Sequence, residues 1–96
     1  MNDIEQLEKS YNNRISFAEE SLKYINVCVK DNKGKLISFP KVINEVAQIF
    51  RKMGKFDEGL LKYICCSMVG LRYSERLQSI ISIIIGLKEW RKNRND

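Results

Sequence analysis

The chain has 96 residues, of which 44% are hydrophobic and 30% are charged, and its formal net charge at pH 7 is +5. This length supports one domain, residues 1–96, and the balance of apolar and charged side chains argues against a disordered chain. The sequence has no histidine, and its three cysteines include no CxxC pair. We therefore predict neither a metal nor a cofactor. We expect all three cysteines to be small apolar core residues: Cys28, Cys65 and Cys66.

The charge is unevenly distributed. Residues 1–22 carry five acidic and two basic side chains, a balance of −3, which leaves +8 for the rest of the chain. Basic residues gather at 30–35, 51–55 and 88–94. Two of these clusters fall where a helix is expected to end, and the helix dipole favours cations there. The basic balance fits either a solvated surface or an acidic partner, whether protein, nucleic acid or membrane surface.

The first predicted helix covers residues 3–29. Apolar residues recur there every three or four positions, and Asp3 is a suitable N-cap. The end of this segment also fits a β-hairpin, because apolar residues occupy alternate positions before a turn-like Asp31-Asn32-Lys33-Gly34 sequence. The sequence leaves both alternatives open for residues 24–39: a continued helix or a short hairpin.

The second predicted helix begins at Ser38 and Pro40. Serine is a common N-cap, and proline is favoured in a first helical turn. The apolar face of this helix runs to Met53, and Gly54 is its C-terminal stop.

Two more helices are predicted at 58–72 and 75–92. Asp57 and Glu58 begin the third helix, and Ser74 with Glu75 begins the fourth. Short connections favour antiparallel neighbours. The predicted fold is all-α, a compact four-helix bundle or related helical array, with the alternative of a mainly α fold carrying a hairpin at 24–39.

Residues 60–87 are the most apolar stretch, and we expect them to supply the core. Leu60 to Leu71 carry apolar residues at helical spacing, and so does the last helix. Ile83 and Ile85 fall off the apolar stripe of that helix, so it is either buried from several directions or docks a partner. A homodimer through the last helix is one prediction, with Ile85 in its interface.

The longest uncharged run near the end, residues 77–87, is about half of what a membrane span needs. The N-terminal residues lack the basic and apolar pattern of a secretory signal. We therefore expect a cytoplasmic protein without a transmembrane segment.

No motif indicates an enzyme. Gly34-Lys35 is followed by leucine, where a phosphate-binding loop needs serine or threonine. The adjacent acids at 19–20 and 57–58 point to different sides of a helix and do not converge on a substrate. We predict a protein without catalytic activity.

The leading functional hypothesis is a protein-binding module, of the kind of the small inhibitors, immunity proteins and antitoxins that neutralise a bacterial toxin. Such a module needs a rigid scaffold and a surface that blocks its target. Tyrosine, tryptophan and arginine dominate interface energetics. We expect Ile83 and Tyr63 to be core residues, and the partner-binding residues to be Arg72, Tyr73, Arg76, Trp90 and Arg91.

Two alternatives remain open. Residues 58–92 could form a nucleic-acid-binding helix-turn-helix, although isoleucines cover much of its second helix. The residues that would lead into the groove are Ser74, Glu75, Arg76 and Gln78. The basic C-terminal segment around Trp90 could instead hold a bacteriocin immunity protein on a membrane surface.

Overall fold

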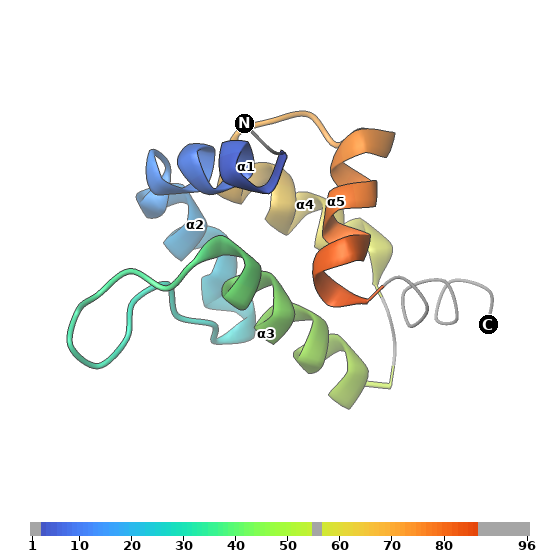
Figure 1. Ribbon diagram of the computed structural model, residues 1–96. Coiled ribbons are helices and arrows are strands. Elements are labelled where there is room, and N and C mark those ends of the chain that lie inside the picture. The colour runs from blue at the N-terminus through green and yellow to red at the C-terminus, as the bar shows by residue number, and fades with distance from the viewer. Residues whose placement is uncertain (1–2, 55–56, 87–96) are drawn as a thin grey trace.

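The computed structural model describes residues 3–54 and 57–86, and these form five α-helices and one short 3-10 helix (Figure 1). They contain no β-strand, so the fold is the all-α array that the sequence predicts. The elements are α1 (Asp3–Asn12), α2 (Ile15–Leu22), η1 (Lys23–Ile25), α3 (Phe39–Lys52), α4 (Glu58–Val69) and α5 (Glu75–Ile85).

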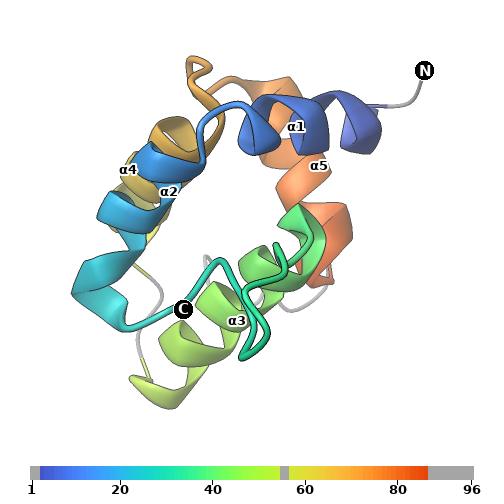
Figure 2. The same ribbon diagram turned by 90° about the vertical axis from the view of Figure 1, so that its left-hand side faces the viewer.

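The helices surround a single core. Helix α2 packs along α4, α3 packs against α5, and α1 contacts both α3 and α4 (Figure 2). All five α-helices contribute buried apolar side chains, with α3 supplying more than any other. The core is therefore wider than the predicted stretch 60–87. Its largest fully buried side chains are Tyr11, Phe39, Phe50, Leu22, Ile43, Leu61, Ile64, Met68, Ile81, Val42 and Val46.

The prediction of one continuous helix over residues 3–29 is wrong. The chain breaks between α1 and α2, where Arg14 leaves the helical conformation with φ −129° and ψ 33°. Asparagines at positions 12 and 13 have low helix propensity, and the break lets α1 turn away from α2. Apolar spacing continues across the break, so periodicity alone does not reveal it.

The Arg14 side chain fills the corner that this break creates. Its Nε donates a hydrogen bond to the carbonyl of Ser67 on α4 at 3.5 Å, and its guanidinium lies 4.1 Å from the centre of the Phe17 ring. Gly70, at the end of α4, has φ +67°, and a Cβ atom there would lie 2.5 Å from the Arg14 side chain. The Arg14 side chain thus fills the corner between α1, α2 and α4 and packs directly against the backbone of Gly70.

The helix also ends earlier than predicted. After η1, Asn26 adopts the left-handed conformation with φ 56°, which asparagine tolerates at a helix end. Residues 27–38 form a loop in which Lys30 and Leu36 make an isolated antiparallel bridge. The hairpin alternative is closer to this geometry, although the bridge is too short to count as a pair of strands.

Helix α3 begins where the sequence predicts, but the side chain of the predicted N-cap residue does not accept a hydrogen bond from the first backbone N–H groups of the helix. Ser38 occupies the N-cap position without a side-chain capping bond. The backbone N–H of Phe39 instead donates to a carboxylate oxygen of Glu8 on α1 at 2.6 Å. A long-range acidic side chain therefore binds the positive end of the helix dipole and ties α1 to α3.

The boundaries of the last two helices follow local signals. Asp57 and Ser74 accept capping hydrogen bonds from the backbone, at 2.9 Å and 3.2 Å. Helix α4 stops before Gly70, and α5 stops at Ile85 because Gly86 has φ +93°. The rest of the predicted 75–92 helix lies outside the described residues. Within those residues, no helix has the length and apolar character needed to cross a membrane.

Tyr11 joins α1 to the segment that precedes α3. Its side chain is fully buried, its hydroxyl donates to the carbonyl of Ile37 at 2.8 Å, and its ring centre lies 5.7 Å from that of Phe39. Burial, followed by the charges of Glu8 and Glu19, raises the pKa of Tyr11 from 10.0 to about 12. The neutral phenol is therefore part of the folded state.

We expect alkaline pH to destabilise the fold through this group. The pKa is higher in the folded chain, so the contribution is complete below about pH 10 and is lost as the pH rises toward about 12. The loss due to Tyr11 should reach roughly 2–3 kcal/mol. Urea unfolding of wild type and Tyr11→Phe at about pH 8 and about pH 11 checks this. Tyr11→Phe should lose less stability between the two values; an equal loss would assign the effect to other groups, such as Cys65.

Candidate functional site

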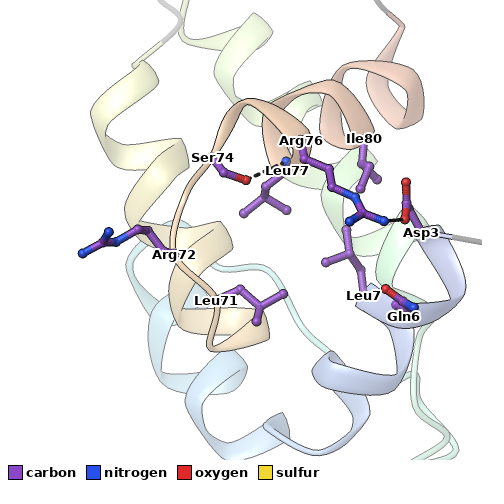
Figure 3. A pocket seen from close by; sticks show the side chains of 9 residues that line it. All are labelled: Asp3, Gln6, Leu7, Leu71, Arg72, Ser74, Arg76, Leu77 and Ile80. Carbon is purple, nitrogen blue, oxygen red and sulfur yellow. Dashed lines mark hydrogen bonds and ion pairs between the residues drawn. The ribbon is translucent and has the colours of Figure 1, made fainter.

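A surface pocket lies between α1 and the segment that joins α4 to α5. Its volume is about 130 Å³ (Figure 3). Helix α1 supplies one wall, and residues 71–80 supply the rest. The lining residues are Asp3, Gln6, Leu7, Leu71, Arg72, Ser74, Arg76, Leu77 and Ile80.

The floor of this pocket is apolar. Leu7, Leu77 and Ile80 are buried core residues that reach it from α1 and α5. Leu71 stands at the rim with 48% of its surface exposed. Its exposure corrects the prediction that it continues the apolar face of the third helix. That helix ends at Val69, and the turn at Gly70 redirects Leu71 toward solvent.

The charged groups of the pocket lie around its rim. Arg76 reaches across from α5 and forms an ion pair with Asp3 at the start of α1 (Figure 3). The hydrogen bond and charge of Asp3 raise the pKa of Arg76 above its already high ordinary value. Arg72 is exposed and points away from the apolar floor (Figure 3). One guanidinium group, that of Arg76, thus pairs with a carboxylate at the opening, and that of Arg72 points outward.

Three of the five predicted partner-binding residues fall within the described chain. Arg72 and Arg76 both line the pocket. Tyr73 does not; it is partly buried, and its ring centre lies 5.3 Å from the ammonium of Lys62. Trp90 and Arg91 lie outside the described residues. The structure therefore brings together the two arginines of the α4–α5 region.

Sequence reasoning missed the contribution of α1 to this pocket. Asp3, Gln6 and Leu7 are separated from Arg76 by some 70 residues. Nothing in the local pattern of either segment indicates that the two meet. The acidic first turn of α1 indicates that this helix can pair with a cation, but not with which one.

Several other expectations about exposure are wrong. Ile83 and Tyr63 were predicted to be core residues, yet they are 68% and 54% exposed. Ile85, the predicted interface residue of the last helix, is only 5% exposed. Residue Cys28 is exposed rather than buried. Each error has the same cause, since a helix or loop with apolar residues on every side does not indicate which side meets the core.

The vicinal cysteines lie in α4. Cys65 is buried, and Cys66 is partly exposed. Burial, with a smaller effect of Cys66, raises the pKa of the Cys65 thiol to about 12. A thiol with so high a pKa is protonated at neutral pH and is a poor nucleophile. Cys65 thus acts as a small apolar residue, as predicted.

The segment predicted as a helix-turn-helix is built into the array differently. Helix α4 makes its main contacts with α2, and α5 makes its main contacts with α3. Ser74 accepts a capping bond from Leu77, and Arg76 is paired with Asp3. Two of the residues predicted to enter a groove therefore already have partners within the chain.

No family model, no curated protein and no solved structure matches the chain.

Proposed function

We propose that this chain is a small protein-binding module without catalytic activity, an inhibitor or immunity protein of the antitoxin type that neutralises a toxin or effector by direct binding. The observation that carries the proposal is the pocket between α1 and the α4–α5 segment. Its apolar floor, exposed Leu71 and two rim arginines together form a receptor for one anchoring side chain of a partner.

The size of the pocket favours a protein partner over a small-molecule substrate. Pockets for small ligands usually measure about 300–1,000 Å³. A volume of about 130 Å³ is well below that range. A cavity of about 150 Å³ holds a benzene ring, so this pocket accommodates one leucine-sized side chain. Receptors of this size are typical of the centre of a protein interface, where an anchor fills a desolvated pocket.

The residues around the opening support the same interpretation. Arginine is enriched at interface hot spots, and the apolar floor supplies the surface that an anchor would bury. Leu71 and Arg72 are adjacent and exposed, so a partner can reach both without unfolding the chain. The absence of histidine from the sequence gives no support to an enzyme that uses this residue as a base.

The test is a pull-down with tagged protein from the native cells, with nuclease treatment and mass spectrometry. Wild type should capture one protein in stoichiometric amount. The variant Leu71→Ser with Arg72→Ala should lower capture about tenfold or more, because truncating a hot spot costs about 2 kcal/mol or more. A matched control is Tyr24→Ser with Lys23→Ala, another exposed pair of one apolar and one cationic residue.

The outcomes separate cleanly. Equal capture by the pocket variant and the control would contradict this site. The absence of any stoichiometric protein after nuclease would contradict the protein-binding function itself.

Trp90→Ala with Arg91→Ala belongs in the same assay, and the sequence predicts weaker capture with unchanged helicity. Normal capture by that variant would remove the C-terminal segment from the contact.

A further inference from the structure

The loop between η1 and α3 carries a hairpin that extends beyond the helices. In Figure 1 it projects from the side of the array, and in Figure 2, turned by 90°, it lies in front of α3. Lys30 and Leu36 form its antiparallel bridge. The N–H of Ile37 donates to the carbonyl of Val29 at 2.7 Å, which closes its base.

The tip of this hairpin is held in one conformation by its own hydrogen bonds. The Asp31 carboxylate accepts from the backbone N–H groups of Lys33 and Lys35, both at 2.9 Å. The Asp31 N–H donates to the Lys35 carbonyl at 2.9 Å, and the Gly34 N–H donates to the Asp31 carbonyl at 3.0 Å. The buried Tyr11 hydroxyl anchors the base through Ile37. The hairpin is thus ordered before any partner arrives.

The hairpin carries three exposed lysines: Lys30, Lys33 and Lys35. None of them takes part in the ion pairs formed among residues 3–54 and 57–86. Neighbouring side chains of an extended arm alternate in direction. Lys30 lies opposite Leu36, so Lys35, next to Leu36, falls on the other face of the hairpin. Lys33 lies in the turn, where the Asp31 carboxylate is also exposed. Residues 30–35 therefore carry three positive charges and one negative charge, a net +2, with a lysine on each face and one at the tip.

The composition of the tip discriminates between possible anionic partners. Residues 31–35 include no apolar side chain. A protein interface needs an apolar centre and is depleted in lysine, and stable binding to a membrane combines basic charge with apolar residues that insert. A flat acidic surface would also meet only one face of the hairpin. The groove of a nucleic-acid duplex has phosphates on both walls, so it can engage cations on both faces at once.

We propose that this hairpin inserts into the major groove of B-form DNA and binds the phosphates of both strands through Lys30, Lys33 and Lys35. The major groove is wide enough for a two-stranded β-ribbon, so it has room for the two arms of this hairpin, which a single bridge joins. Lysine binds phosphate as a point charge and lacks the fork that reads guanine, so this contact is independent of sequence. The site is separate from the pocket at Leu71 and does not depend on the function proposed for it. It also places DNA contact away from the predicted helix-turn-helix.

The experiment measures fluorescence anisotropy of a labelled DNA duplex of mixed sequence, about 16 base pairs long, titrated with the full chain at several salt concentrations. The test variant is Lys30→Gln with Lys33→Gln and Lys35→Gln. The matched control is Lys9→Gln with Lys23→Gln and Lys52→Gln, three exposed lysines on the helices. Each variant removes three charges, so the two have the same net charge. Circular dichroism confirms that both remain folded.

Wild type should bind the duplex with an affinity that falls steeply with salt. The hairpin variant should lose about tenfold or more in affinity, and its slope against log salt should flatten by about 2–3, as expected for three lost phosphate contacts. The control should stay within about threefold of wild type. An equal loss of affinity in both variants would show that only the net charge of the chain matters, and this would overturn the proposal.

Two further outcomes would also overturn it. Equal or tighter binding to the single strand of the same sequence would exclude insertion into a duplex groove. Binding to vesicles that contain phosphatidylserine, with none to the duplex, would assign the hairpin to a membrane surface.

Discussion

Replacing Phe39 with alanine is expected to lower the free energy of unfolding by about 3–5 kcal/mol. The side chain is fully buried at the start of α3, and its ring packs against that of Tyr11. The substitution removes most of an aromatic side chain and leaves a cavity where α1, α3 and the preceding loop meet. A domain of this size has a total stability of about 5–15 kcal/mol, so the loss is a large part of it.

Urea unfolding followed by far-ultraviolet circular dichroism measures this loss. Phe17→Ala is a suitable control, because Phe17 is 56% exposed on α2. Its loss should stay near 1 kcal/mol or less, reflecting only its contact with Arg14. Similar losses for the two substitutions would contradict the burial of Phe39. A small loss for Phe39→Ala alone would mean that the start of α3 repacks easily.

The second large effect is a difference in stability between lysine substitutions at two isoleucines of α5. Ile85→Lys places an ammonium group at a site that is 5% exposed, and we expect it to cost several kcal/mol or to unfold the chain. Ile83→Lys places the same group at a site that is 68% exposed, and its cost should stay within about 0.5 kcal/mol. Thermal and urea unfolding of the two variants checks the contrast directly.

The exposure of these two isoleucines decides which of them can be substituted to test self-association. The sequence predicts a homodimer through the last helix with Ile85 in the interface, but burial of Ile85 makes its substitution a test of folding. Ile83 is the exposed isoleucine of α5, so Ile83→Lys is the informative variant. If wild type is a dimer in light scattering, this variant should become monomeric while remaining folded. An unchanged dimer mass would exclude Ile83 from the interface.

Local signals in the sequence predict α3 well. Ser38 and Pro40 mark its start and Gly54 its end, because the preferences of these residues operate within one turn of the helix. The break at Arg14 is different, since apolar residues keep helical spacing across it and the low helix propensity of Asn12 and Asn13 is too weak a signal to place the turn. The loop at 27–38 lies between these cases. The sequence predicts the turn that begins at Asp31, but it predicts neither the helix end at Asn26 nor the number of ladder bonds in the loop.

The candidate site was predictable only in part. Arg72 and Arg76 were identified because arginine is one of the residue types that dominate interface energetics. Their relation to Asp3 depends on how α1 crosses the array, and sequence spacing carries no information about that. The exposure of Ile83 and the burial of Ile85 depend similarly on which side of α5 meets α3. Residue type thus predicts the kind of contact that a side chain can make. Whether the side chain lies in the core or on the surface depends on how distant helices pack.

The contact between Arg14 and Gly70 has a consequence for sequence variation. A side chain at position 70 would meet the arginine and would also have to adopt a positive φ, so Gly70 is constrained in two ways while Arg14 is present. Loss of Arg14 removes the steric conflict but not the backbone requirement. Among any relatives with this corner, we expect the arginine to be replaced first, and glycine or asparagine to persist at position 70. Asparagine at position 70 should then occur only in sequences that lack arginine at position 14, and this pairing would mark the α1–α2 break in sequences without a structure.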